Sequence, residues 1–322
     1  MTHTPALLRR INDSSFMDPP RDGIEARVGR EGDLVRLVSP ASWPEEAWVH
    51  ESVSILEGWG LRVDVAAHAM DRHGFCAGRD EDRLADLNDA FSDPEVRAIV
   101  ATRGGAGAYR IADFLDFDAV RADPKPLVGF SDITHIHLAL WHHCRLPSVH
   151  GALAGTTAQA SVRQLLMTND PLTVRRHDGA VSAAVNVRGR ASGPLVGGNL
   201  TSVATSVGAR LSGLDGAILF LEDLKHKGLG FVDRLLTQLR QSGSLDGVAG
   251  IALGSFEGFR DVTDRGWTIV DVLHDRLAML GVPVLGGIFA ATTSSVKTGA
   301  RTRWHSISAL SLSSTPSLVS CR

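Results

Sequence analysis

The 322-residue sequence has little of three things: cysteine, net charge and long apolar runs. Its three cysteines, Cys76, Cys144 and Cys321, are widely spaced and odd in number, which excludes a disulfide framework and a cysteine zinc site. A formal net charge of −3 excludes a polybasic surface, so we expect no nucleic-acid partner. No stretch approaches the roughly 20 apolar residues of a membrane span, so we expect no membrane partner.

The first residues carry no clear folding signal. Residues 1–31 contain charged residues and the Pro19-Pro20 pair, and they lack the apolar core of a signal peptide. We expect a loose N-terminal arm here and a cytoplasmic protein.

From Gly32 onward, short apolar strands alternate with amphipathic helices. Strands are expected at residues 34–38, 61–65, 98–102 and 126–129. A helix follows Ser42, which is expected to be its cap with Glu45 reaching back, and another helix is centred on residues 84–91. This alternation predicts an α/β fold with a doubly wound parallel sheet, in which ligands bind beyond the carboxyl ends of the strands.

The chain divides into an α/β domain over residues 32–154, a polar and irregular linker over 155–185, and a C-terminal domain over 186–322. In the C-terminal part we expect strands at residues 216–221, 251–254 and 282–285, and a helix at 232–241.

The segment Gly129-Phe130-Ser131-Asp132 places a serine at a sharp strand-to-helix turn. Such a turn exposes the hydroxyl as a nucleophile, and the next backbone N–H lies where it can stabilise an oxyanion. The segment is not the full G-x-S-x-G pattern, because Ile133 replaces the second glycine. A structural role for Ser131 as a helix N-cap stays open.

Two other segments carry possible chemistry at strand ends. The run from Arg103 to Gly107 lets backbone amides approach an anion, although it lacks the lysine-serine pair of a P-loop, and a glycine turn without a ligand explains it equally well. Glu222 and Asp223 follow an apolar strand; they are either a strand end with a helix cap, or they include the carboxylate that orients a histidine in a Ser-His-Glu triad.

Five histidines lie close together in the sequence, but no carboxylate or cysteine completes a metal set with them. We therefore expect no metal and no cofactor, and we expect surface or capping histidines at positions 135, 137, 142, 143 and 150.

Taken in order, these segments resemble the LD-carboxypeptidase family of serine peptidases, which includes microcin-immunity-type peptidases. The similarity covers roughly residues 32–288 and rests on an ordered set of motifs. These are Gly32-Asp33 to Ser39-Pro40, Gly78 to Asn88, Thr102 to Gly107, Pro124 to Thr134, His150-Gly151, Gly197 to Leu200, Leu219 to Asp223 and Asp233 to Leu239.

The resemblance implies a serine carboxypeptidase with an α/β N-terminal domain and a smaller, strand-rich C-terminal domain. It implies that Ser131 is the nucleophile, that Glu222 is the triad carboxylate, and that the N–H groups of Asp132 and the Gly104-Gly105 loop are the oxyanion donors. The implied substrate is a murein peptide, cleaved at an L-to-D amide bond near a free carboxylate during peptidoglycan recycling. A homodimer is suggested by the resemblance alone.

The triad histidine that the resemblance implies is missing. Family members carry a Gly-His pair shortly after a strand like 282–285, where this chain has Ala291-Thr292. Back-translating the tail with G or C in third positions and reading one base earlier restores Gly-His at that place. We therefore expect the tail from about residue 289 to be a frameshift product.

Two alternatives to a murein carboxypeptidase stay open at this point. One is a hydrolase of aminoacyl-nucleotide toxins, and the other is a catalytically impaired ligand-binding relative, which the missing histidine favours. A nucleotide-binding module is disfavoured because the glycine loop lacks a phosphate-binding lysine.

Overall fold

The structure is a computed structural model of the whole chain. It describes residues 29–153, 156–170, 172–174, 176–211 and 213–288, together with the backbone of two strands at 310–312 and 317–321. The predicted N-terminal arm lies outside the described residues apart from its last three. Of these, Gly29 donates its N–H to the carbonyl of Leu166 at 2.7 Å.

The first domain is built around a six-stranded sheet in the order β12-β5-β4-β3-β1-β2. All its strands are parallel except β12, which runs antiparallel to β5. The strands are β1 (Leu34–Val38), β2 (Arg62–Val65), β3 (Val96–Ala101), β4 (Leu127–Gly129), β5 (Ser148–His150) and β12 (Leu310–Leu312). The order reverses between β1 and β3, and in doubly wound sheets ligands bind at such a reversal.

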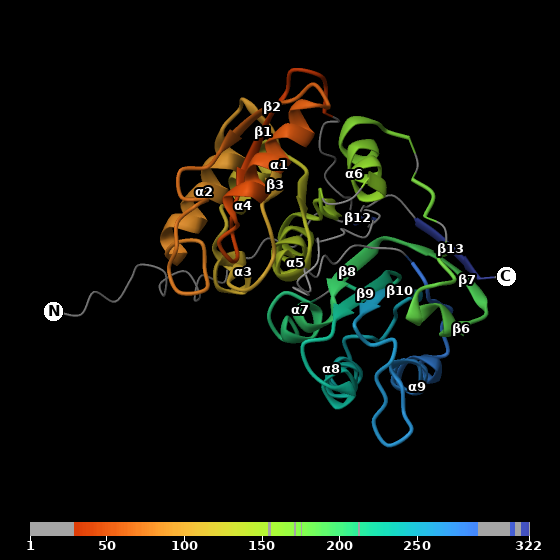
Figure 1. Ribbon diagram of the computed structural model, residues 1–322. Helices are drawn as coiled ribbons and strands as arrows, with labels where there is room; N and C mark the ends of the chain where they lie inside the picture. Colours follow the sequence, from red (N-terminus) through yellow and green to blue (C-terminus); the bar gives the residue numbers. More distant parts are fainter. Residues whose placement is uncertain are drawn as a thin grey trace.

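Helices cover both faces of this sheet (Figure 1). One apolar cluster joins one sheet face to α1 and α6, and another joins the opposite face to α2, α4 and α5. The helices are α1 (Glu46–Glu57), α2 (Asp80–Ser92), α3 (Ala108–Ile111), α4 (Phe117–Ala122), α5 (Thr134–Cys144) and α6 (Thr156–Met167). The α/β, doubly wound parallel sheet expected from the sequence is confirmed.

The second domain has a five-stranded sheet in the order β6-β11-β10-β9-β8, parallel except for β6, and a ribbon in which β13 pairs antiparallel with β7. Its helices pack on one face of the sheet over a large apolar cluster. The strands are β6 (Asn186–Val187), β7 (Gly189–Gly193), β8 (Leu195–Asn199), β9 (Ile218–Leu224), β10 (Gly250–Glu257), β11 (Val284–Leu285) and β13 (Ser317–Cys321); the helices are α7 (Leu200–Thr205), α8 (Leu229–Gln241) and α9 (Ile269–Leu277).

Three local expectations differ from the structure. Ser42 does not cap α1, whose cap position is Glu45 without a side-chain bond; instead the Ser42 hydroxyl accepts the N–H of Ala106 at 3.0 Å. The stretch predicted as a linker contains α6, whose Val162 and Leu166 pack in the core of the first domain. Glu222 and Asp223 lie inside β9 rather than after it, because the strand continues to Leu224.

Helix α5 lies between the two domains, and both of its long faces are buried (Figure 1). Ile136 and Leu140 pack in the first core, whereas Leu138 packs in the second. The expectation of surface or capping histidines is wrong at three positions, because His135 and His137 on α5 and His150 at the end of β5 are each at most 3% exposed.

Candidate active site

Ser131 stands at the turn between β4 and α5 in a strained backbone conformation. Its φ is 58°, in the left-handed region that residues other than glycine rarely adopt. It begins a short 3-10 turn, Ser131–Ile133, that leads directly into α5. The N-cap positions are Phe130 for this turn and Ile133 for α5, so Ser131 is not a helix N-cap. This strained strand-to-helix turn is the geometry that exposes a nucleophilic hydroxyl.

The glycine loop after β3 packs directly against Ser131. A Cβ placed on Gly104 would lie 2.6 Å from the Ser131 Cβ and 3.0 Å from its Oγ, so only glycine fits there. Gly105 has φ = 114° and lies against Ser42. Among the described residues the N–H groups of Gly104 and Gly105 have no hydrogen-bond acceptor, so these donors remain available close to the Ser131 hydroxyl.

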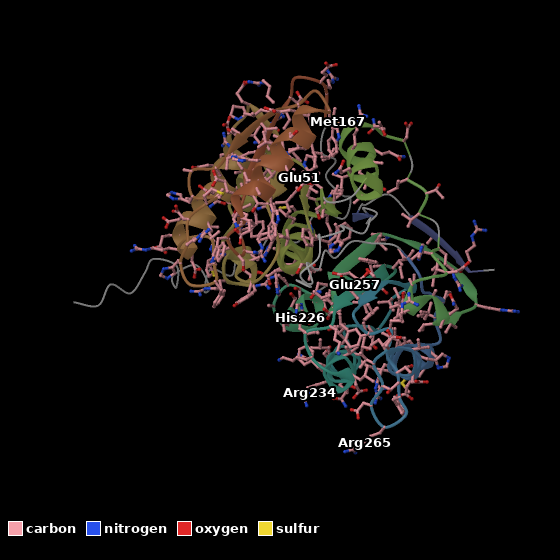
Figure 2. All side chains as sticks on the ribbon, in the orientation of Figure 1. Glu51, Met167, His226, Arg234, Glu257 and Arg265 are labelled. Atoms are coloured by element: carbon pink, nitrogen blue, oxygen red, sulfur yellow. The ribbon has the colours of Figure 1, made fainter. Side chains whose placement is uncertain are left out.

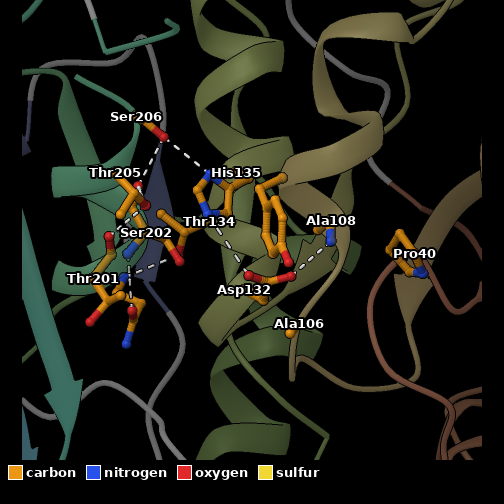
Figure 3. A network of polar contacts seen from close by, with 12 residues as sticks. Pro40, Ala106, Ala108, Asp132, Thr134, His135, Thr201, Ser202, Thr205 and Ser206 are labelled. Atoms are coloured by element: carbon orange, nitrogen blue, oxygen red, sulfur yellow. Dashed lines mark hydrogen bonds and ion pairs between the residues drawn. The ribbon is translucent and has the colours of Figure 1, made fainter. Parts of the chain in front are cut away.

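The side chain of Asp132 ties this loop to the turn (Figure 3). Its carboxylate accepts the N–H of Ala108 at 2.8 Å, and the backbone of Gly107 also bonds to it. Burial raises the pKa of Asp132 to about 6, although these backbone bonds and the nearby arginines act in the opposite direction. The sequence argument considered only the N–H of this residue and missed the role of its carboxylate.

Ser131 opens onto a cavity of about 220 Å³ between the two domains. Residues of the first domain line most of it, and Asn199, Leu224 and His226 come from the second. Figure 2 shows Glu51, another lining residue, on the first domain and His226 on the second. The cavity therefore lies at the carboxyl ends of β3 and β4, as expected for this fold.

Glu222 lies on β9, two residues before Leu224 of the cavity wall, and its side chain is fully buried. Its Oε1 is 3.7 Å from Nε2 of His150, which is itself fully buried. Burial lowers the pKa of His150 to about 3, so its ring is neutral at physiological pH. His150 is not among the residues that line the cavity, whereas His226 is.

Asp223, the next residue of β9, forms hydrogen bonds with two side chains of the second domain. It accepts the side-chain amide of Asn199 at 3.0 Å and the hydroxyl of Thr201 at 3.0 Å. Asn199 also donates its backbone N–H to the hydroxyl of Thr134 at 3.0 Å, which links the second domain to the start of α5. Asn199 was part of a quoted motif, but no role for it was foreseen.

A second polar network crosses the domain boundary above Asp132 (Figure 3). Arg210 donates to Nδ1 of His135 at 3.0 Å and pairs with Asp113 of the first domain. Nδ1 of His135 also lies 3.1 Å from the Ser206 hydroxyl. Burial, helped by the positive charge of Arg210, lowers the pKa of His135 to about 3.

The described residues offer one group of potential metal ligands, His68, Asp71 and Asp82, and none of the three lines the cavity beside Ser131. The cluster His135, His137 and His150 contacts protein groups instead. None of the described helices is long and apolar enough to cross a membrane. Ala291 and Thr292, at the position where the resemblance implies the triad histidine, lie outside the described residues.

The fold and the strained serine turn define the chain as an α/β protein of the serine-hydrolase type. Profiles of the LD-carboxypeptidase N-terminal and C-terminal domains match residues 35–151 and 192–295, and the chain belongs to this family. A putative carboxypeptidase of Streptomyces coelicolor is 38% identical over 79% of this chain and 83% of its own length. A probable murein peptide carboxypeptidase of Bacillus subtilis is 34% identical over 80% of this chain and 83% of its own length.

Solved structures agree with this family membership. A muramoyltetrapeptide carboxypeptidase from Oxalobacter formigenes superposes with a TM-score of 0.69 at 26% identity, covering 79% of this chain and 87% of its own. A protein from Bacillus anthracis related to the microcin immunity protein superposes with a TM-score of 0.77 at 22% identity, covering 91% and 94%, and this similarity shows the fold alone.

Proposed function

We propose that the chain is a serine carboxypeptidase that removes the terminal D-amino acid of a murein tetrapeptide by cleaving an L-to-D amide bond. The observation that carries the proposal is the strained Ser131 turn, which opens onto a cavity beside the Gly104-Gly105 loop. Relatives named as murein peptide carboxypeptidases, one of them 33% identical from Pseudomonas aeruginosa, support the substrate class.

In the proposed reaction the Ser131 hydroxyl attacks the carbonyl of the scissile amide. In the protein with the restored tail, its proton passes to the triad histidine that Glu222 orients, and the N–H groups of Gly104, Gly105 and Asp132 stabilise the oxyanion. Collapse of the intermediate expels the D-amino acid, which takes up the proton as its amine leaves. Water then hydrolyses the acyl-serine ester and restores the hydroxyl.

The chain as written lacks a histidine at Ala291-Thr292, and we propose that it is catalytically impaired for this reason. His150 does not replace the missing base, because it is fully buried and outside the cavity wall. His226 is the only histidine among the described residues that line the cavity. Loss of one triad member costs on the order of 10⁴ to 10⁶ in rate.

Release of D-alanine from murein tetrapeptide tests the proposal in two proteins: the chain as written and a version whose tail is read one base earlier from residue 290. We expect release from the second protein only. If the chain as written releases D-alanine and its His226→Gln variant does not, His226 would instead be the base. If neither the chain as written nor the tail-restored version releases D-alanine, the carboxypeptidase assignment would be contradicted.

Two further tests address the tail and the alternative substrate. Resequencing the gene decides whether the frameshift is a sequencing error, since the same codons confirmed on independent clones would exclude an error and leave a true mutation. Hydrolysis of an aminoacyl nucleotide in preference to the tetrapeptide would favour the toxin-hydrolase alternative.

We also propose a cytoplasmic location and a homodimer. The location is supported by the two described cysteines, Cys76 and Cys144, which are buried free thiols as in reducing compartments. The dimer rests on family membership, and light scattering after gel filtration tests it: a mass near 34.4 kDa would contradict it.

A further inference from the structure

Arg103 is the only arginine or lysine among the described residues that line the cavity beside Ser131. It directly precedes Gly104, whose backbone packs against the Ser131 side chain. A positively charged side chain therefore lines the cavity directly next in sequence to the glycine that packs against the nucleophile.

The guanidinium of Arg103 is held by neutral groups. Its Nη1 donates to the carbonyl of Trp43 at 3.2 Å, and its Cζ lies 5.3 Å from the centre of the Trp48 ring. No carboxylate in the described part of the chain lies within ion-pair distance of it. Its neighbours fix its position but leave its charge without a direct counterion.

This environment destabilises the charged form of Arg103 and favours binding of an anion. Burial lowers the pKa of Arg103, opposed by the charge of Glu45, but an arginine stays protonated at neutral pH. One of its five N–H groups bonds to Trp43, so others remain for a planar, two-pronged contact with a carboxylate.

The other charged groups of the cavity are placed differently. Glu51, on α1, would repel a carboxylate, and His226 enters from the second domain. Arg103 is thus the permanent positive charge in the cavity wall, on the same loop as Gly104.

Resting on the proposed function, we propose that Arg103 is the specificity residue that binds the free α-carboxylate of the terminal residue of the substrate. In a peptide cleaved at its last bond, that carboxylate lies one residue, roughly 3.5 Å of chain, beyond the scissile carbonyl. Arg103 and Ser131 line the same cavity, so one bound peptide can contact both. The contact would confine cleavage to the last bond and make the enzyme an exopeptidase.

Binding to a Ser131→Ala protein tests the assignment without turnover. Calorimetry compares murein tetrapeptide as the free acid with the same peptide as its C-terminal carboxamide. We expect the acid to bind about 10- to 100-fold more tightly. Adding Arg103→Met, which keeps an apolar stem, should remove this preference and leave the affinity for the carboxamide within about twofold. Adding Arg103→Lys should keep part of the preference for the acid, because lysine retains the positive charge but lacks the planar guanidinium that binds a carboxylate with two hydrogen bonds.

Arg72→Met is the matched control. The Cζ of Arg72 lies 4.0 Å from the centre of the Trp43 ring, but Arg72 does not line the cavity, so the preference for the acid should be unchanged. Equal binding of the acid and the carboxamide would overturn the role of Arg103 but not the murein substrate. The same conclusion would follow if the preference for the acid survived Arg103→Met and disappeared in His226→Gln. Failure of both peptides to bind the Ser131→Ala protein would overturn the murein substrate itself.

Discussion

At the scale of single residues, the site depends on how closely backbone and side chain approach at Ser131. The left-handed φ of this serine is maintained by β4 before it and α5 after it. The missing side chain of Gly104 leaves room for the hydroxyl. Strain of this kind persists only where the surrounding structure over-determines it.

Gly104→Ala tests this close approach. The new Cβ would lie 2.6 Å from the Ser131 Cβ and 2.9 Å from the Phe130 carbonyl oxygen, so the loop must move. We expect a loss of about 1–3 kcal/mol in unfolding free energy by urea denaturation, and at least about a 10²-fold fall in kcat/KM of the tail-restored protein.

Gly230→Ala is the control for that variant. It lies in α8, and a Cβ added there would meet no atom within 4 Å, so alanine should raise stability by up to about 1 kcal/mol. If Gly104→Ala behaved like this control, the close packing against Ser131 would be refuted.

His137 gives a pH-dependent prediction. Its ring is fully buried, its Nε2 lies 3.0 Å from the carbonyl of Gly129, and burial lowers its pKa to about 4. Because the unfolded chain binds this proton near pH 6.5 and the fold only near pH 4, stability falls as pH drops through that window. His137→Gln keeps a donor to the carbonyl and should flatten the dependence by up to about 1.4 kcal/mol per pH unit.

Urea unfolding at half-unit steps between pH 4 and 7 measures this slope. His50→Gln, at an exposed position on α1, should leave it unchanged. A slope unaltered by His137→Gln would mean that the ring is not held neutral by burial.

At the scale of elements, the site is assembled from strand ends that the sequence pattern located well. The strand at 34–38 and the turn at Ser131 were predictable because apolar runs, glycine and a following helix mark them locally. The buried histidines of α5 were not, because a helix between two domains has two apolar faces and no clear amphipathic period. Ser42 was misread because its bond to Ala106 joins residues that are far apart in the sequence.

Asp132, whose carboxylate accepts the N–H of Ala108 at the start of α3, should change the pH dependence of stability in the opposite direction to His137. Burial raises the pKa of Asp132 to about 6, so the fold binds this proton more readily than the unfolded chain. Its contribution to stability is therefore largest at low pH and declines as pH rises from about 4 to 6.

Asp132→Asn removes this titration while an amide oxygen can still accept the N–H of Ala108. The free energy of unfolding should then fall more steeply as pH drops from 6 to 4, by up to about 1.4 kcal/mol per pH unit. A shallower profile in the same urea experiment would contradict the protonation that we assign to Asp132.

At the scale of the whole molecule, the cavity exists because two α/β domains meet across α5. Arg210 of the second domain pairs with Asp113 of the first and bonds to His135, so it connects the domains close to the site. The sequence could not foretell this contact, since it joins positions 97 residues apart. The sequence also did not predict that Asn199 and His226 line the cavity, because their position depends on how the two domains pack together.

Arg210→Met should loosen the domain contact. The guanidinium is buried but Asp113 is partly exposed, so we expect a loss of about 1–3 kcal/mol, seen as a lower thermal midpoint. Arg234→Met on the outer face of α8 (Figure 2) should change stability by less than about 0.5 kcal/mol. Equal midpoints for the two variants would show that the Arg210 contact does not hold the domains together.

The nucleophile assignment is tested most directly by D-alanine release from murein tetrapeptide by the tail-restored protein, with and without Ser131→Ala. If Ser131 attacks the amide, the alanine variant should lose at least about 10³-fold in rate, while its unfolding midpoint stays near that of the parent. Release that continues at a comparable rate in the Ser131→Ala protein would contradict the role of Ser131 as the nucleophile.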